Sequence, residues 1–475
     1  MAGQQSQDLA HLPATELLAL YRARRLSPVE ATRAALERIA EHDGAVNAFC
    51  LVDEDGALAA ARASEARWQR GEPCGLVDGV PATVKDVMLT KGWPTLRGSR
   101  AIPRDQPWEE DAPIVARLRE HGAVFLGKTT TPEFGWKGVT DSPLTGITRN
   151  PWDTRTTPGG SSGGAAAAAA LGMGALHTGS DGGGSIRIPA GFTGIFGHKP
   201  SYGRVPAYPA SPYGSISHHG PMTRTVRDAA LMMNVIALPD GRDWTALPYD
   251  ARDWRIGLED GVRGLRVAFS PRLGLDSVRV DPEIARLVAD AARVFEDLGA
   301  VVEEADPDLR DAPEVFRTHW SVGSAFALHA LSEEQRAVMD PGLLEVAAEG
   351  GRVALPDYLH AASRRAAIGR RMNRFHDAYD LLLSPTLPLP AFPAGREVAD
   401  PTTQPRWYDW TPFSYPFNLT QQPACTVPCG FTGAGLPAGL QIVGRRYDDA
   451  LVLRAARAFE AVRPFVMPGA PRTAT

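Results

Sequence analysis

A glycine-, serine- and alanine-rich segment, residues 159–200, constrains this chain more than any other stretch. Its sequence is GGSSGGAAAAAALGMGALHTGSDGGGSIRIPAGFTGIFGHKP. Two glycine-flanked serine sites, Ser161–Ser162 and Ser185, lie on either side of six consecutive alanines, Ala165–Ala170. Glycine permits backbone conformations that other residues avoid, and alanine favours a helix while adding almost no side-chain bulk. The segment therefore predicts a thin helix that lies close against a sheet, between two serine-bearing turns.

Three glycines directly precede the second serine site. The backbone N–H groups of Gly182, Gly183 and Gly184 can point into one concavity and form a nest for an anion. A serine beside such a nest suits acyl transfer, because the serine attacks a carbonyl and the nest holds the oxyanion. The alternative is a flexible Gly/Ser-rich linker. Linkers do not carry the apolar, strand-like residues that follow here, namely Ile186, Ile188, Ile195 and Phe196.

A serine nucleophile needs a base, and the candidate is Lys85, at the end of the strand-like stretch Val80–Val84. A lysine at a strand end usually extends its charge to solvent, because a buried cation is costly. Together with the serine sites we favour a different interpretation, in which burial beside neutral hydroxyls lowers the lysine pKa and makes it a base. His177 and His198 are the histidines nearest to the serine sites, but neither is adjacent to one, and a more distant histidine stays open as the base.

Three motifs in this segment resemble those of the amidase signature family. They are GGSSGG at Gly159–Gly164, GSDGGGSIRIPA at Gly179–Ala190, and GHKPSYGR at Gly197–Arg204. Upstream, Val84–Lys85–Asp86 matches the V-K-D element of the family. One position departs from the pattern, since the family usually has threonine, isoleucine or a similar residue where Gly182 stands. The resemblance runs from about Leu12 to Phe465.

The resemblance implies a Ser–cis-Ser–Lys hydrolase that acts on amides. Ser185 would be the nucleophile, Ser161 the bridging serine on a cis peptide, and Lys85 the base. The N–H groups of Gly182, Gly183, Gly184 and Ser185 would hold the oxyanion, and neither a metal nor an organic cofactor would be needed. Ser162, Asp181 and Arg187 are expected as supports: Ser162 would orient the Ser161 loop, and the other two would pair with loop amides or with each other.

Two aromatic segments, Phe134–Trp136 and Trp407–Phe413, are candidates for the substrate pocket. We expect Gly135, Trp136 and Trp410 to contact the substrate, although the alternative that these rings fill the core is equally weighted. An apolar pocket would prefer neutral aryl or alkyl amides, with related esters or carbamates accepted. Free glutamine and dicarboxylic half-amides should be poor substrates, because Lys137 and Arg406 are the only candidate cations beside these segments.

Two other functions are weighed against this one. The first is the glutaminase (A) subunit of a tRNA-dependent amidotransferase, which the sequence His218–His219–Gly220–Pro221 disfavours, since that subunit usually has a Leu-Asp-Gln-type approach to its Gly-Pro. The second is a non-catalytic binding protein on the same scaffold, which the presence of all three triad residues disfavours. The His218–His219 pair itself is expected in a loop.

The fold class expected is α/β, with a single-domain α/β/α sandwich around a large mixed twisted β-sheet and an N-terminal helical layer. Alternating strand and helix patterns before and after residue 240 indicate β–α–β units, and the strands on each side are too few for two separate sheets. The whole of 1–475 is therefore taken as one domain, with helices at about 12–70, the signature core at about 75–240 and a C-terminal half at about 260–465.

Composition limits the location and the partners. A net charge of −5, with positive and negative residues interspersed, argues against a nucleic-acid partner. The sequence contains no stretch of about 18 apolar residues, so no membrane span is expected. Four cysteines in 475 residues suit a reducing cytoplasm, and Cys425 and Cys429 are expected in the core rather than on a metal. The partner expected is a small-molecule amide; the N-terminal helices either brace the body or form the contact of a homodimer.

Overall fold

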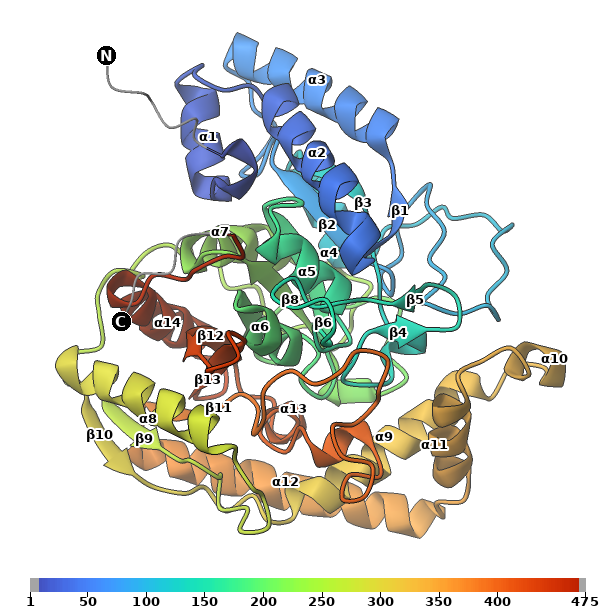
Figure 1. The fold of residues 1–475 in the computed structure, drawn as a ribbon, viewed down its shortest axis with the longest axis vertical. Coiled ribbons are helices and arrows are strands. Elements are labelled where there is room, and N and C mark those ends of the chain that lie inside the picture. Colours follow the sequence, from blue (N-terminus) through green and yellow to red (C-terminus); the bar gives the residue numbers. More distant parts are fainter. Residues whose placement is uncertain (1–7, 470–475) are drawn as a thin grey trace.

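The computed structural model of this chain describes residues 8–469, and a mixed 11-stranded sheet runs through it (Figure 1). The strand order is β1-β3-β2-β6-β8-β7-β12-β13-β11-β9-β10, so strands from before and after residue 240 lie in one sheet. A separate pair is formed by β4 (Asp141–Ser142) and β5 (Gly146–Ile147). The strands of the large sheet are β1 Phe49–Val52, β2 Pro81–Lys85, β3 Val124–Thr129, β6 Leu176–Asp181, β7 Phe196–Lys199, β8 His218–Thr223, β9 Arg266–Phe269, β10 Val301–Glu304, β11 Leu381–Pro385, β12 Ala424–Phe431 and β13 Pro437–Gly444.

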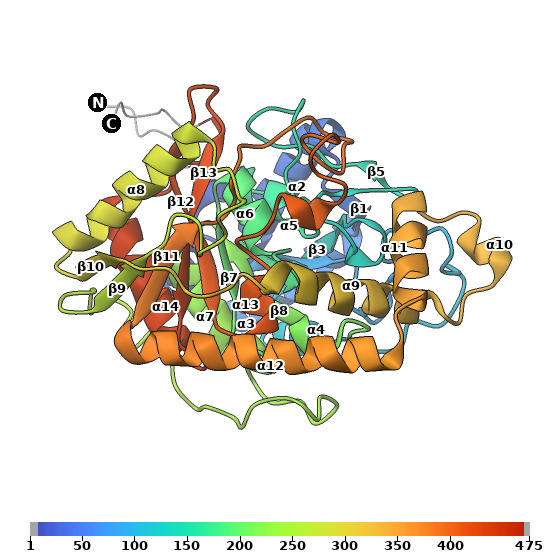
Figure 2. The same cartoon turned by 90° about the horizontal axis from the view of Figure 1, so that it is seen from below.

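Helices cover both faces of this sheet. In Figure 1, α5 and α6 lie over its middle, beside β6 and β8, and Figure 2 shows the long α12 running alongside α9. The helices are α1 Ala14–Arg22, α2 Pro28–Val46, α3 Glu54–Arg70, α4 Pro113–Glu120, α5 Gly163–Ala170, α6 Arg187–Thr193, α7 Val226–Ile236, α8 Pro282–Asp297, α9 Ala312–Leu328, α10 Glu333–Arg336, α11 Pro341–Gly351, α12 Leu355–Ala378, α13 Pro416–Leu419 and α14 Asp449–Val462. Among the described helices, none has the length and apolar character needed to cross a membrane.

The alternation of side chains along the strands explains the layers. Leu381 and Leu383 of β11 belong to one hydrophobic core, which α1, α4, α7, α8 and α14 cover, whereas Leu382 between them points into a second core under α9 and α12. Successive side chains of a strand face opposite sides of a sheet, so a continuous apolar strand is stable only when both faces are covered. The mixed sheet between helical layers that the sequence predicted is confirmed.

The alanine run forms α5, as expected, and every residue of this helix is buried. At its first turn not even alanine would fit: a Cβ added at Gly164 would lie 2.4 Å from Thr130 Oγ1 and 2.5 Å from Ala48 O. The thin helix therefore lies against the β2–β3–β6 region of the sheet and holds the first serine site directly over the strand that carries Lys85.

Two local expectations are wrong. Ile186 and Ile188 are not in a strand: Ile186 precedes α6 and Ile188 lies in it, because the Asp181 carboxylate accepts the first N–H groups of this helix, at Ile186 and Arg187. His218 and His219 are not in a loop but begin β8, opposite Asp181 and Ser180 of β6. In both cases the hydrogen-bond partner lies outside the immediate sequence neighbourhood: Asp181 for the start of α6, and the strand β6 for His218 and His219.

Candidate active site

Lys85 lies at the centre of a cluster of serine hydroxyls. Its Nζ is 2.7 Å from Ser161 Oγ, 2.8 Å from Ser162 Oγ and 2.9 Å from Ser180 Oγ. The side chain is fully buried at the last position of β2, and the backbone N–H of Lys85 donates to Thr178 Oγ1 across the neighbouring strand. Three neutral hydroxyls thus surround the amine. No carboxylate of the described residues lies within ion-pair distance of it.

Burial lowers the pKa of Lys85 well below its ordinary value, and the charge of Asp181 offsets this only in part. Desolvation disfavours the charged form of an amine, and hydroxyl groups do not replace the water that an ammonium loses. Burial thus shifts Lys85 toward the neutral amine, the form that could accept a proton from the serine hydroxyl it contacts. This agrees with the direction expected from the sequence.

The turn that carries Ser161 is closely packed. The peptide bond between Gly160 and Ser161 is cis, as the family resemblance implied for Ser161. A Cβ added at Gly160 would lie 2.5 Å from the Val139 backbone, so only glycine fits there. The N–H of Ser162 donates to Ser185 O at 3.1 Å, which joins the two serine turns, and Ser162 thus contacts both Lys85 and the nucleophile segment.

The glycines before Ser185 do not all have available N–H groups. The N–H of Gly184 donates to Asp181 Oδ1 at 2.8 Å, so it is not available to an oxyanion, and its inclusion in the predicted nest is corrected. The N–H groups of Gly182, Gly183 and Ser185 have no hydrogen-bond partner within residues 8–469. These three donors remain as the candidate oxyanion hole.

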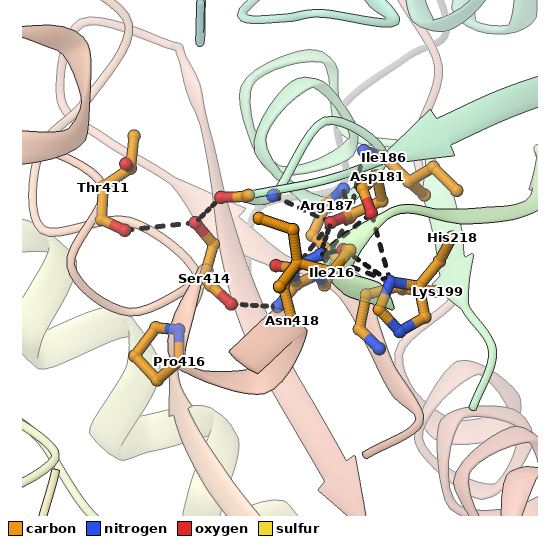
Figure 3. A network of polar contacts seen from close by, with 12 residues as sticks. Asp181, Ile186, Arg187, Lys199, Ile216, His218, Thr411, Ser414, Pro416 and Asn418 are labelled. Atoms are coloured by element: carbon orange, nitrogen blue, oxygen red, sulfur yellow. Dashed lines mark hydrogen bonds and ion pairs between the residues drawn. The ribbon is translucent and has the colours of Figure 1, made fainter. Parts of the chain in front are cut away.

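Asp181 and Arg187 form a buried ion pair, as Figure 3 shows. Arg187 Nη2 is 2.9 Å from Asp181 Oδ1, and Asn418 Nδ2 donates to the same oxygen at 2.8 Å. Burial by itself would raise the pKa of Asp181, but the charge and hydrogen bonds of Arg187 outweigh it and the pKa is lowered. The carboxylate therefore stays ionised and can hold the N–H groups of Gly184, Ile186 and Arg187.

Arg187 also ties this loop to the C-terminal half of the chain. Its Nη1 donates to Ser414 O at 2.7 Å and to Gln441 Oε1 at 2.8 Å, and its Nη2 donates to Asn418 Oδ1 at 2.7 Å. Ser414 Oγ in turn donates to Gly183 O at 2.6 Å. The two supports pair with each other and with loop groups, as the sequence suggested, and do not line the cavity beside Ser185.

A cavity of about 200 Å³ opens beside both serines. Ser161, Ser185 and Gly182 line it, and so does Gly135, where a Cβ would lie 3.2 Å from Ser161 Oγ. The aromatic rings of the wall are those of Phe134, Tyr208, Tyr213 and Trp320, and the polar lining includes Arg97 and His219. Gly135 is therefore at the pocket, as predicted.

The expectation that Trp136 and Trp410 contact the substrate is wrong. Both side chains are fully buried in the second hydrophobic core, and neither lines the cavity. Trp136 Nε1 donates to Asp340 Oδ2 at 3.2 Å, and Trp410 Nε1 donates to Glu397 O at 3.0 Å while its ring stacks on Phe192. The equally weighted alternative, that these rings fill the core, is the correct one.

Sequence reasoning missed most of the pocket wall. Trp320 comes from α9, and its ring stacks on Tyr213 at 3.9 Å between centroids. His219 comes from β8, and Arg97 follows β2 by a loop. Nothing local marks Trp320 or Tyr213 as site residues; the one available signal was the His218–His219 pair next to Gly220–Pro221.

Comparison with known proteins agrees with this geometry. The amidase family model matches residues 30–453. An acylamidase of Rhodococcus erythropolis is 40% identical, with 97% of each chain covered. The A subunit of the glutamyl-tRNA(Gln) amidotransferase of Myxococcus xanthus is 40% identical, with 98% of this chain and all of the relative covered. A bacterial aryl acylamidase, described as one of the amidase signature enzymes, superposes with a TM-score of 0.90 at 33% identity over 96% of this chain and 97% of its own. This chain belongs to the amidase signature family and is an enzyme that hydrolyses amide C–N bonds.

Proposed function

We propose that the enzyme hydrolyses carboxylic acid amides through an acyl-enzyme on Ser185. Neutral Lys85 accepts the proton of Ser161 Oγ as Ser161 Oγ accepts that of Ser185, and Ser185 Oγ attacks the carbonyl carbon. The N–H groups of Gly182, Gly183 and Ser185 stabilise the oxyanion. The proton then returns through Ser161 to the leaving amine as the C–N bond breaks. Water hydrolyses the ester by the same relay and regenerates Ser185.

One observation carries this proposal: the 2.7 Å hydrogen bond between Lys85 Nζ and Ser161 Oγ, made by an amine whose pKa burial lowers. A protonated lysine could donate to Ser161 but could not take its proton. Ser161 and Ser185 line the same cavity, and in this proposal Ser161 relays the proton between Ser185 and Lys85 without any histidine.

The substrate class we propose is aryl or alkyl amides, with related esters or carbamates accepted. Four aromatic rings line the small cavity, and such walls bind apolar groups. The similarity to an acylamidase and an aryl acylamidase supports the same class.

The direct test is Ser185→Ala, with Ser363→Ala on the exposed side of α12 as the matched control. Ser185→Ala should abolish hydrolysis of an aryl amide and labelling by a fluorophosphonate probe, because Ser185 is the cavity serine that directly follows the glycines of the candidate oxyanion hole. Ser363→Ala should retain both. Labelling of the Ser185 variant, with the adduct mapped to another residue, would exclude this nucleophile; absence of labelling in the natural protein would favour a non-catalytic binding protein.

A glutaminase role in an amidotransferase remains the second candidate, because several relatives are named as the A subunit of glutamyl-tRNA(Gln) amidotransferase. Free glutamine has an α-ammonium group, and no aspartate or glutamate is among the residues that line the cavity. We therefore expect kcat/KM for glutamine to be far below that for an aryl amide such as acetanilide. Faster turnover of glutamine, in a purified protein without partner subunits, would reverse the order of the two candidates.

We further propose a cytoplasmic enzyme with a small-molecule substrate and no nucleic-acid or membrane partner. All four cysteines, Cys50, Cys74, Cys425 and Cys429, are free thiols, which suits a reducing compartment. Fractionation of the cells that produce the protein tests this location.

A further inference from the structure

Arg97 is a cation in the catalytic cavity that the proposed mechanism does not use. It lies in the loop after β2, and its carbonyl accepts the N–H of Phe134 at 2.8 Å, while the next N–H, at Gly98, donates to Asp86 Oδ2 at 3.3 Å. Arg97 has φ 55° and Gly98 has φ 65°. These bonds hold a sharp turn that presents the arginine next to Phe134–Gly135, the segment that contacts Ser161.

The Arg97 guanidinium has no hydrogen bond or ion pair to any described residue. It lies over the Phe134 ring, with Cζ 6.0 Å from the ring centroid. The carboxylate of Asp86 is near enough for its charge to oppose the lowering of the Arg97 pKa by burial. However, Asp86 Oδ1 is already paired with Lys128 Nζ at 2.9 Å. The five N–H donors of this half-buried guanidinium are thus left for a ligand.

Other cations near the site are already paired. Lys137 contacts Asp141 at 2.6 Å and Asp340 at 2.8 Å, and Arg406 pairs with Glu345. These were the two cations that the sequence suggested as clamps, and their partners occupy them. Arg97 is therefore the arginine or lysine that both lines the cavity and lacks a carboxylate, within the described part of the chain.

The remaining titratable groups of the cavity do not neutralise Arg97. No aspartate or glutamate lines it. Burial lowers the pKa of His219 to about 4, so this imidazole is neutral at pH 7. A half-buried cation without an anionic partner has lost part of its hydration, and a carboxylate that binds it through two parallel hydrogen bonds recovers part of that cost.

We propose that Arg97 binds a carboxylate of the substrate, separate from the amide that is cleaved. This rests on the proposed function and narrows it: the preferred substrates are amides with an apolar or aryl part and a carboxylate, on either the acyl or the amine portion. Dicarboxylic half-anilides and acylated aminobenzoates belong to this class. This proposal replaces the expectation that half-amides are poor substrates, which assumed that Lys137 and Arg406 are the only candidate cations beside the two aromatic segments.

The test uses two pairs of isosteric substrates. For the acyl side, succinyl para-nitroanilide is compared with isocaproyl para-nitroanilide, in which two methyl groups replace the carboxylate oxygens. For the amine side, meta-acetamidobenzoate is compared with meta-isopropylacetanilide. Each is measured with the natural protein, Arg97→Met, Arg97→Lys and the control Arg100→Met, an exposed arginine in the same loop. Thermal unfolding checks that each variant is folded.

In at least one pair, the natural protein should favour the acid. Arg97→Met should lower kcat/KM for that acid about tenfold to a hundredfold, the range for hydrogen bonds to charged groups, and change the neutral partner by less than about threefold. Arg97→Lys should retain part of the preference, because it keeps the charge but loses the planar fork. Arg100→Met should change neither member.

Equal effects of Arg97→Met on both members of both pairs would overturn the inference while leaving the proposed function intact. If the natural protein cleaves none of the four substrates, the proposed function fails instead. Arg97 is then decided by calorimetry of succinyl para-nitroanilide binding to Ser185→Ala: loss of affinity on adding Arg97→Met supports the carboxylate site, and unchanged affinity excludes it.

Discussion

At the scale of single residues, the partner of a buried lysine decides its chemistry. Lys85 and Lys137 are both buried beside the site. Burial lowers the pKa of each, but Lys137 contacts two carboxylates that more than reverse the effect, so its pKa is raised, whereas that of Lys85 stays well below the ordinary value. The carboxylates of Asp141 and Asp340 thus favour the charged form of Lys137, whereas burial favours the neutral form of Lys85, as the proposed role of a base requires.

The pH dependence of the reaction follows from Lys85. The neutral amine is the active form, so kcat/KM should fall as the pH decreases through the lowered pKa of Lys85 and stay level above it until another group titrates. Lys85→Ala should lower kcat/KM by about 10²–10⁴, the usual contribution of a general base, and the acidic limb should disappear from what remains. A Lys85→Ala enzyme that keeps most of its activity and the same acidic limb would assign the base to another group.

At the scale of elements, the turn between β6 and α6 is held by charge rather than by local propensity. α6 has only seven residues, Arg187–Thr193, and the residue at its N-cap, Ile186, has no side chain that could accept a hydrogen bond. The N–H groups of Ile186 and Arg187 donate to the Asp181 carboxylate instead. The same carboxylate positions Gly184, whose φ of 127° excludes other residues. The geometry of the turn that carries Ser185 therefore depends on the ion pair between Asp181 and Arg187.

We predict that Arg187→Met destabilises the protein by about 3–5 kcal/mol, because it leaves Asp181 as a buried charge without its partner. The free energy of unfolding in urea measures this. The matched control is Arg364→Met, which removes an ion pair with Glu314 in which the Glu314 side chain is 72% exposed, and should cost about 0–1 kcal/mol. A loss for Arg187→Met as small as for the control would contradict the structural role given to this pair.

At the scale of the whole molecule, the N-terminal helical layer is joined to the body by buried polar contacts. Asp228 of α7 accepts the N–H groups of Ala14 and Thr15, each at 2.9 Å, and so caps α1 from a helix more than 200 residues away in sequence. Arg224 donates to the carbonyl oxygens of Ala10 and Leu12 at 3.2 and 3.1 Å. The layer braces the body through these contacts.

We predict that Asp228→Ala costs about 1–3 kcal/mol of stability, because it leaves two buried N–H donors without acceptors. Proteolysis should then cut first within residues 8–26, while labelling of Ser185 in the folded protein persists. Urea unfolding and limited proteolysis measure these effects, with Glu37→Ala on the exposed side of α2 as the control. Unchanged proteolysis would mean that hydrophobic packing of α1 suffices to hold the layer.

The sequence by itself determined the features that depend on backbone freedom and local pattern. The glycines around Ser161 and Ser185, the alanines of α5 and the strand that ends at Lys85 were all recognisable, because close packing and turns admit few residue types.

Only the tertiary structure decided which groups face the cavity. Trp136 and Trp410 point into the core, whereas Trp320 and Arg97 reach the pocket, and an aromatic or charged residue in a loop carries no local mark of its direction. The same holds for hydrogen bonds between distant segments: Asp181 occupies the N–H of Gly184, and β6 supplies the partner that makes a strand of His218–Thr223. Direction and partnership are long-range properties, since they depend on which surfaces are brought together by folding.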